Sequence, residues 1–286
     1  MTGATLGVDL GGTKCQLLWV NEDNQVVDRV RFPSPDSPEG LVDSLANEVE
    51  KRPARAIGIG VPGFVDRAQQ FVIRCPNLPR YVDFPLAAEL SRKSGVPTTL
   101  ENDANAAALA ESRLGAGKGF ASQILVILGS GVGGGIVENG NVYRGAGYAG
   151  EIGHLTIDKD GDLCGCGRRG CWELFASGRA LARIAGKTRG EEVRDGIVNA
   201  ERWALDAIAT YAARVAEGLA DVVLILAPQL VVLGGGVSEV GQPLVDGVRR
   251  ELVRRLPEFL EPPQIRVAEL GNDAGALGAA LGAFKS

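Results

Sequence analysis

Hydrophobic residues along the chain form short aliphatic runs that alternate with longer segments of helical periodicity. Leu41, Val42, Leu45 and Val49, for example, stand near the spacing of one apolar helix face. The elements predicted for the first part are strands over 5–10, 15–20 and 25–32, a helix from 38 or 39 to 51, a strand over 56–61, a helix over 84–94, a strand over 98–100 and a helix over 104–114.

The same succession of patterns begins again in the second half. Its predicted elements are strands over 123–128 and 136–138 around a glycine turn over 129–135, helices over 178–185 and 201–226, a strand over 229–233, a helix over 243–256, a strand over 264–267 and a final helix over 273–284. Both halves open with a hydrophobic strand, a glycine turn and a second strand. We therefore expect two α/β domains with a cleft between them, joined near residues 109–119.

Composition places the chain among ordinary globular proteins. Hydrophobic residues make up 45% and charged residues 23% of its 286 positions, which is enough for a sizeable core. The net charge of −5 and the pI of about 5.2 disfavour a nucleic-acid-binding surface. No apolar run approaches the ~20 residues of a membrane helix, and we expect no signal peptide. The expected compartment is therefore the cytoplasm.

The segment from Gly150 to Glu173 holds the most specific candidate chemistry. It contains the single histidine of the chain, His154, and three of the five cysteines, namely Cys164, Cys166 and Cys171. One imidazole and three thiolates form a complete tetrahedral ligand set for zinc. Because Glu151 and Glu173 stand at the two ends of the segment, we expect the metal to shape a loop that carries chemistry.

Two alternatives to a structural zinc site stay open. A disulfide between Cys164 and Cys166 would be strained, since one residue separates them, and nothing marks the chain as secreted. The cysteines could also be unrelated core residues, as we expect for Cys15 in its apolar run. A catalytic zinc is disfavoured because four protein ligands leave no open coordination position.

Three glycine clusters follow aliphatic runs. In Asp9-Leu10-Gly11-Gly12-Thr13-Lys14, a glycine turn could present backbone N–H groups to a phosphate, with a hydroxyl and a cation beside them. Asp9 could hold Mg²⁺ through water. The spacing is not that of a P-loop, and a simple glycine hairpin is the alternative.

The other two clusters are Gly129 to Gly135 and Gly234 to Gly236. The former contains Gly-x-Gly-x-x-Gly, but no helix is predicted after it, so the dinucleotide-binding interpretation fails. A β-hairpin whose turn contacts phosphate fits better. The latter, between a strand and a helix, could pass close to a nucleotide base or ribose, or could be a packing turn.

Asp103 stands immediately before a predicted helix, in Glu101-Asn102-Asp103-Ala104-Asn105. Its residue type favours a helix N-cap. The functional alternative is a carboxylate at the domain boundary that points into the cleft.

Taken together, these motifs resemble the ROK family (repressors, open reading frames and kinases) of the actin-like ATPase superfamily. The chain carries them in family order: Asp-x-Gly-Gly-Thr-Lys, Glu-Asn-Asp-Ala-Asn, Gly-x-Gly-x-Gly-Gly, then Gly-Glu-x-Gly-His with Cys-x-Cys-Gly-x-x-Gly-Cys-x-Glu. The resemblance spans residues 6–284. It implies two ribonuclease H-like α/β domains with mixed sheets flanking a cleft: a small N-terminal domain of residues 1–110 plus 273–286, and a large domain of residues 111–272 with the zinc loop.

Family kinases transfer the γ-phosphate of ATP to a hexose hydroxyl, and the resemblance assigns the roles residue by residue. Asp103 is the general base, which takes the proton of the sugar 6-hydroxyl. The implied sugar contacts are Gly63, Asn102, Asp103, Glu151, His154 and Glu173. The implied ATP and Mg²⁺ contacts are Asp9, Gly11, Gly12, Thr13, Lys14, Gly131, Gly133, Gly234, Gly235 and Gly236. The implied ligands of a structural Zn²⁺ are His154, Cys164, Cys166 and Cys171.

Two departures from the family pattern are small. Ser130 replaces the usual threonine and keeps the hydroxyl, and Trp172 replaces an aliphatic residue, so that it could stack near the sugar or simply pack.

Rival functions within the family are a sugar-responsive repressor and a non-catalytic sugar sensor. Asp9 stands so near the start of the sequence that we expect no DNA-binding domain, and Asp103 with both phosphate turns disfavours a sensor. Glucose is the favoured substrate, because Gly63 to Asp66 and Pro76 to Pro79 look like bacterial ROK glucokinases. Fructose, mannose, allose and N-acetylmannosamine stay open as substrates, polyphosphate is disfavoured as donor, and a homodimer formed through the large domain is implied.

Overall fold

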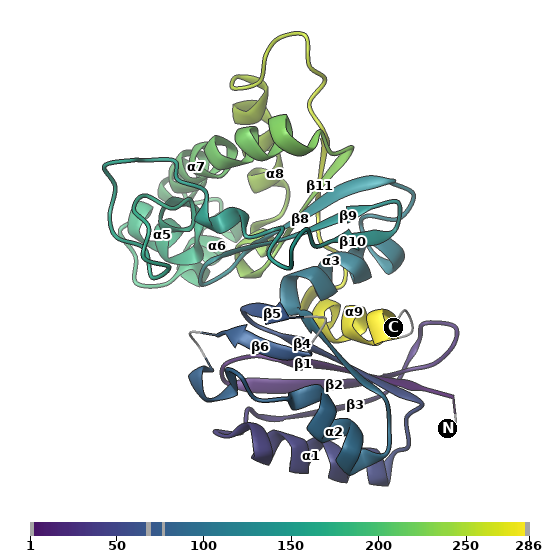
Figure 1. The fold of residues 1–286 in the computed structure, drawn as a ribbon. Helices are drawn as coiled ribbons and strands as arrows, with labels where there is room; N and C mark the ends of the chain where they lie inside the picture. Colours follow the sequence, from purple (N-terminus) through teal and green to yellow (C-terminus); the bar gives the residue numbers. More distant parts are fainter. Residues whose placement is uncertain (1–2, 67–69, 76–77, 284–286) are drawn as a thin grey trace. The chain divides into compact units, whose positions relative to one another are not determined.

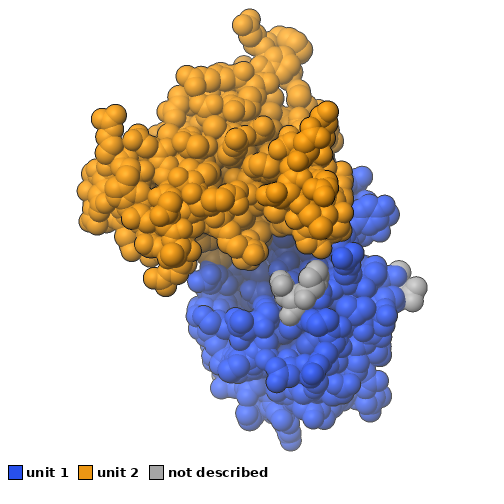
Figure 2. Space-filling model, turned by 90° about the vertical axis from the view of Figure 1, so that its left-hand side faces the viewer, with its two compact units in different colours: residues 1–113, 141–149, 272–286 blue, residues 114–140, 150–271 orange. Residues whose placement is uncertain are grey.

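The computed structural model describes residues 3–66, 70–75 and 78–283, which form two compact units. Unit 1 comprises residues 1–113, 141–149 and 272–286, and unit 2 comprises residues 114–140 and 150–271 (Figure 2). The chain forms two five-stranded mixed sheets with helices (Figure 1), so the predicted α/β class is confirmed. Residues 141–149 lie within unit 1, whereas the sequence-based boundaries had left them with the large domain.

The sheet of unit 1 begins with the predicted meander. Its strands are β1 (Thr5–Leu10), β2 (Lys14–Val20), β3 (Val26–Pro33), β4 (Ala56–Val61) and β7 (Thr98–Asn102), in the order β3-β2-β1-β4-β7. β1 pairs antiparallel with β2 and parallel with β4, and β4 pairs parallel with β7. A small hairpin of β5 (Phe64–Asp66) and β6 (Phe71–Arg74), which the sequence did not predict, follows β4.

Helices cover both faces of this sheet. They are α1 (Pro38–Lys51), α2 (Leu86–Ser94), α3 (Asp103–Leu114) and α9 (Ala274–Gly282). α1 and α2 lie on one face and α9 on the other (Figure 1), in contact with β1 and β4. α1 begins where Ser37 Oγ accepts a hydrogen bond from the N–H of Gly40 at 3.1 Å. Its predicted apolar stripe is buried, with Leu41 and Leu45 inaccessible to solvent.

The second sheet repeats the strand order of the first. Its strands are β8 (Ser122–Leu128), β9 (Val132–Glu138), β10 (Asn141–Tyr143), β11 (Leu230–Gly234) and β12 (Gln264–Val267), in the order β10-β9-β8-β11-β12. All of them belong to unit 2 except the edge strand β10, whose residues are part of unit 1. In both sheets an antiparallel hairpin precedes two parallel strands, β4 and β7 in one and β11 and β12 in the other. The expectation that the two halves open alike is therefore met at the level of topology.

The helices of unit 2 pack around one long helix. They are α4 (Glu173–Ala176), α5 (Gly178–Ile184), α6 (Gly190–Val198), α7 (Arg202–Leu226) and α8 (Gln242–Val253). Trp172 is fully buried, its indole N–H donates to the carbonyl of Arg214 at 2.9 Å, and its ring lies against Gly218 of α7. Trp172 therefore packs in the core. Among the described helices, none is both long and apolar enough to cross a membrane.

The structure corrects the predicted glycine turn over 129–135. The turn is confined to residues 129–131, and β9 already begins at Val132, with Gly133, Gly134 and Gly135 in the strand. Close packing explains why glycine occurs inside this strand. A Cβ atom on Gly134 would lie 2.6 Å from the carbonyl oxygen of Gly150. Helix α6 was also missed. Phe284, predicted as the end of the last helix, and Pro76 and Asn77 lie outside the described residues.

Candidate functional site

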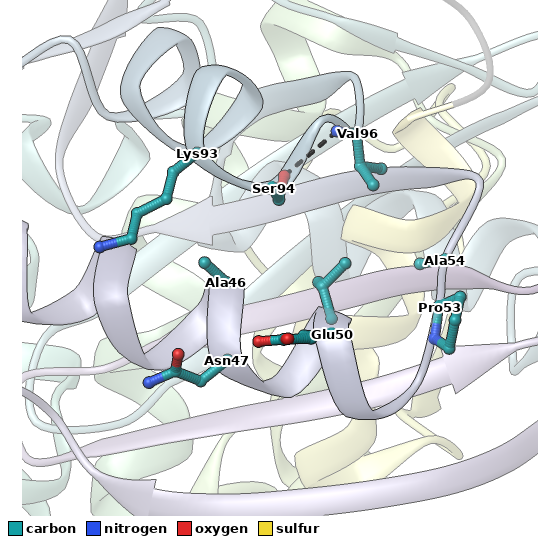
Figure 3. Close-up of a pocket in the computed structure, with 9 residues that line it drawn as sticks. Ala46, Asn47, Glu50, Pro53, Ala54, Lys93, Ser94 and Val96 are labelled. Atoms are coloured by element: carbon teal, nitrogen blue, oxygen red, sulfur yellow. Dashed lines mark hydrogen bonds between the residues drawn. The ribbon is translucent and has the colours of Figure 1, made fainter.

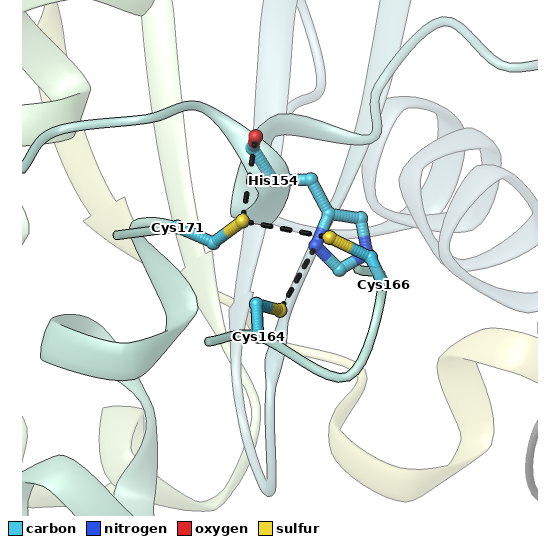
Figure 4. Close-up of side chains that lie close together, drawn as sticks. All are labelled: His154, Cys164, Cys166 and Cys171. Atoms are coloured by element: carbon cyan, nitrogen blue, oxygen red, sulfur yellow. Dashed lines mark hydrogen bonds between the residues drawn. The ribbon is translucent and has the colours of Figure 1, made fainter. Parts of the chain in front are cut away.

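The predicted metal ligands converge in unit 2. One ligand atom from each of His154, Cys164, Cys166 and Cys171 lies within 4.8 Å of the others (Figure 4). His154 Nδ1 lies 3.8 Å from Cys164 Sγ, and the Sγ atoms of Cys166 and Cys171 are 3.5 Å apart. A tight turn brings the cysteines together, since the N–H of Gly167 donates to the carbonyl of Cys164 at 2.9 Å.

This donor set fits a zinc ion better than either alternative. All five cysteines have free thiols, which disagrees with a disulfide, and three sulfurs gathered around one imidazole are more than coincidental core residues. Burial raises the pKa of the Cys164 and Cys171 thiols, so a cation beside these two groups would favour their thiolate forms. Soft sulfur and imidazole ligands in a set of four match tetrahedral Zn²⁺.

Glu173 connects this cluster to the second glycine turn. As the first residue of α4, it accepts a hydrogen bond from Cys164 Sγ to Oε1 at 2.8 Å, and the same oxygen lies 3.6 Å from His154 Nδ1. On its other side, a Cβ atom on Gly131 would come within 2.7 Å of Glu173 Oε2. The metal cluster, Glu173 and the turn therefore form one continuous arrangement.

Glu151 lies close enough to join this arrangement electrostatically. Burial raises the pKa of its carboxyl group, and the neighbouring Glu173 acts in the same direction while His154 opposes both. The three sugar contacts predicted in unit 2, which are Glu151, His154 and Glu173, are thus brought together in the structure.

The first glycine turn is the tip of the β1–β2 hairpin. The N–H of Gly11 donates to the carbonyl of Lys14 at 2.9 Å, and Gly12, Thr13 and Lys14 are exposed. Ser34, which sequence reasoning missed, donates from its hydroxyl to the carbonyl of Gly11 at 2.6 Å and from its N–H to that of Thr13 at 3.1 Å. Two carbonyl groups of the turn are therefore engaged, so they do not oppose an approaching anion.

Asp9 occupies the end of β1 beside the start of α9. A Cβ atom on Gly275 would lie 2.9 Å from Asp9 Cγ, so the carboxyl group is packed against the helix backbone. Burial raises the pKa of Asp9 to about 6. A partly buried carboxylate of this kind gains from a nearby cation.

The structure shows which residue caps the N-terminus of helix α3. Asn102, the last residue of β7, accepts a hydrogen bond on Oδ1 from the N–H of Asn105 at 3.0 Å, which is the usual N-cap contact for a helix that begins at Asp103. Its Nδ2 donates to the carbonyl of Gly63 at 3.0 Å. The carboxylate of Asp103 accepts a hydrogen bond from the neighbouring N–H of Ala104 at 2.8 Å. Capping is therefore the task of Asn102.

A cavity of about 500 Å³ in unit 2 lies next to the second and third glycine clusters. Gly236 lines it, whereas Gly235, with φ of +81°, packs under the carbonyl of Leu128. Ser130 of the second glycine turn also lines the cavity. Sequence reasoning missed the rest of the polar lining, which is Arg179, Thr188, Arg189, Glu191, Arg194 and Glu239. Arg179 Nε donates to the carbonyl of Ser130 at 3.1 Å, which ties α5 to the turn. Ser177, whose side chain caps α5, is a sequence signal for the start of that helix.

A second hollow, of about 530 Å³, lies in unit 1 between the ends of α1 and α2 (Figure 3). Asn47, Glu50, Lys93 and Ser94 contribute its polar lining, and the Ser94 hydroxyl accepts from the N–H of Val96 at 3.2 Å. It contains none of the predicted site residues.

Comparisons with a family model, with curated proteins and with solved structures all lead to the same family. A model described as "ROK family" matches residues 5–285. A glucokinase of Streptomyces coelicolor is 37% identical over 97% of this chain and 96% of its own length. Among solved structures, a ROK family glucokinase from Streptomyces griseus in complex with glucose and AMPPNP is 35% identical, with a TM-score of 0.87 over 99% of this chain and 100% of that chain. A ROK hexokinase from Thermus thermophilus is 37% identical, with a TM-score of 0.87 over 98% of each chain.

Proposed function

Since this chain belongs to the ROK family, we propose that it transfers the γ-phosphate of ATP to the 6-hydroxyl of a hexose, and that the hexose is glucose. One observation carries the proposal. The likeness to a glucokinase solved with glucose and AMPPNP extends over 99% of this chain and all of that one, at 35% identity. The expected fold and the expected cluster of side chains support it independently.

Asp103 would act as the general base. A carboxylate that accepts the proton of the 6-hydroxyl lets that oxygen attack phosphorus, and such assistance contributes typically about 10²–10⁴-fold to the rate. Capping by Asn102 supports the role, because it provides for the helix end without Asp103. Asn102 also fixes the carbonyl of Gly63, the predicted backbone contact to the sugar.

Recognition of the hexose would involve the acids around the metal cluster. Glu151 and Glu173 supply carboxylate acceptors for ring hydroxyls, and His154 can bind the metal through Nδ1 while Nε2 faces the sugar. A site built to hydrogen-bond each hydroxyl rejects sugars that lack one, because its own polar groups are then left unpaired.

ATP would be held by the two hairpin turns. We assign its phosphates to Gly11, Gly12, Thr13 and Lys14 in the first turn and to Gly131 in the second, with Asp9 holding Mg²⁺ through water. Gly133, which the resemblance also assigns to this phosphate contact, lies in β9 directly behind the turn. The nucleoside would occupy the cavity lined by Gly236 and Arg179. Gly234, the last residue of β11, and Gly235 lead the chain into Gly236.

The metal cluster would hold Zn²⁺ through His154, Cys164, Cys166 and Cys171. Four protein ligands complete a tetrahedral site, so the ion supplies rigidity to the loop and no reactive group. Because Glu173 contacts both Cys164 and the Gly131 turn, a rigid loop fixes a sugar contact and a phosphate contact together.

We further propose that the protein is a homodimer formed through unit 2 and acts in the cytoplasm, where thiols stay reduced. Leu224 and Ile225 at the end of α7, Val253 at the end of α8 and Phe259 expose 52%, 71%, 53% and 85% of their surface. A second copy of the chain would cover such apolar side chains. Light scattering of the wild type and of Ile225→Glu tests this, and a wild-type monomer would contradict it.

Sugar specificity is tested by ATP-coupled phosphorylation of glucose, mannose, fructose, allose, N-acetylmannosamine and N-acetylglucosamine. We expect the highest kcat/KM for glucose. A clear preference for another hexose would keep the kinase and replace its substrate. Binding without turnover on any sugar would instead indicate a sensor.

A further inference from the structure

A partly buried ion pair joins two segments of unit 1 that are distant in sequence. Arg144 donates to Glu101 Oε2 from Nε at 2.8 Å and from a terminal nitrogen at 2.5 Å. The side chains of Glu101 and Arg144 are only 12% and 26% exposed. Glu101 lies on β7, two residues before Asp103, and Arg144 follows β10 directly.

Arg144 also organises the loop that follows it. Its carbonyl accepts hydrogen bonds from the N–H groups of Gly147 at 2.8 Å and Ala149 at 3.1 Å, and its second terminal nitrogen donates to the carbonyl of Val142 at 3.0 Å. Arg144 therefore stabilises the loop over 144–149 through its backbone carbonyl and binds Glu101 through its side chain. It runs directly into Gly150 and Glu151 along the chain.

The second oxygen of Glu101 extends the network toward Asp103. Oε1 lies 3.2 Å from the N–H of Asn102 and 3.4 Å from Asn105 Nδ2. Asn105 is 4% exposed, and its own N–H donates to the capping Asn102. The contacts therefore enclose Asp103 along the chain on both sides, from Asn102 to Asn105, and reach Gly63 through Asn102.

The burial of this pair makes it different from an ordinary surface ion pair. Exposed pairs contribute little to stability, whereas a carboxylate that loses its cationic partner in a buried position is strongly unfavourable. Without Arg144, Glu101 would have to rearrange or draw in water, and the N–H of Asn102 would move with it. Misplacement by about 1 Å can reduce catalysis by about 100-fold.

We propose that Glu101 and Arg144 are positioning residues for phosphoryl transfer. Their ion pair anchors the loop over 144–149 to the strand–helix junction that carries Asn102 and Asp103. The inference rests on the proposed sugar kinase function, which it deepens by naming residues that set the position of the base.

The test is steady-state kinetics on Arg144→Ala, Arg144→Lys and Glu101→Gln, with glucose and ATP varied separately and Tm measured on each. Arg144→Ala should lower kcat/KM for glucose by roughly 10–100-fold, with KM for ATP within about twofold of wild type. Arg144→Lys should recover part of the loss because it restores the charge without the fork. Glu101→Gln keeps the side-chain shape but removes the charge, so it tests the same ion pair if Arg144→Ala folds poorly.

Arg52→Ala is the matched control. Arg52 pairs with Glu48 at 2.5 Å in the same unit, with exposures of 32% and 15%, but lies at the end of α1. It should lower Tm and leave kcat and both KM values near wild type. If Arg144→Ala and Glu101→Gln also lower only Tm, the pair is structural and the inference is wrong, although the kinase stands. A wild type without turnover would overturn the proposed function and this inference together.

Discussion

The Oδ1 atom of Asn102 accepts the N–H of Asn105 at 3.0 Å, so Asn102 caps α3. The same side chain donates from Nδ2 to the carbonyl of Gly63. One amide therefore serves both the helix end and the predicted sugar-binding turn.

Replacing Asn102 separates the two tasks. Asn102→Ala removes the cap and should lower the free energy of unfolding by about 1–2 kcal/mol, whereas Asn102→Ser keeps a capping oxygen and should cost only a few tenths. Both variants lose the donor to Gly63, so both should raise KM for glucose. Urea unfolding with parallel kinetics measures this, and equal stability of the two variants would contradict the cap.

Loss of the metal should abolish sugar binding. Wild type should contain one zinc per chain, and chelation should disorder residues 150–173, because structural zinc supplies roughly 10 kcal/mol of apparent binding free energy. Limited proteolysis and glucose titration follow the change. Cys166→Ala should lose the metal, and Cys15→Ala, a buried cysteine outside the cluster, should keep it. Full glucose affinity after proven zinc removal would refute the structural role.

Gly131→Ala should displace Glu173. The new Cβ atom would lie 2.7 Å from Glu173 Oε2, so the carboxylate must leave its place between the turn and the metal cluster. We expect kcat/KM for glucose to fall by roughly 10–100-fold. Gly129→Ala, in the same turn, meets no atom within 4 Å and should change it by no more than about threefold. Comparable losses in the two variants would show that any side chain disturbs the turn.

Asp9 gives the protein a predicted pH dependence. Its pKa rises from 3.8 to about 6 because the carboxyl group is buried. Between these two pH values the folded chain keeps a proton that the unfolded chain has released, so stability falls as pH rises from about 4 to 6 and stays lower above. Asp9→Asn should therefore raise the free energy of unfolding at pH 7 by at most about 3 kcal/mol and should not do so at pH 4.

Activity should show the opposite trend, because protonated Asp9 cannot hold Mg²⁺. We expect turnover to decline below about pH 6, and the midpoint of the decline to move to lower pH as Mg²⁺ is raised. A midpoint that ignores the Mg²⁺ concentration would remove Asp9 from the metal site.

The sequence predicted those features that depend on local order. The two hairpins, the apolar face of α1 and the ligand set from His154 to Cys171 follow from spacing within short segments, and the structure has them all. The glycines at 133–135 were misassigned because their reason is not local. Gly134 makes room for the carbonyl of Gly150, and the residues next to Gly134 in sequence do not indicate this contact.

Contacts between residues that are distant in sequence were likewise not predicted. Glu101 and Arg144 are 43 positions apart, and nothing in their separate surroundings indicates a pair. Ser34 reaches the first glycine turn only because β3 returns beside β2. Helix α6 opens with glycine and carries few apolar residues, so its pattern is weak although tertiary packing holds it against α7.

The general-base role of Asp103 is tested most directly by Asp103→Asn, studied by glucose phosphorylation, calorimetric glucose binding and thermal unfolding together, with the exposed Asp246→Asn as control. We expect kcat to fall by roughly a hundredfold or more. We also expect that glucose still binds, that Tm stays within a few degrees of wild type, and that the control is fully active. Wild-type turnover in Asp103→Asn would contradict the role of Asp103, because phosphoryl transfer would then proceed without the proposed base.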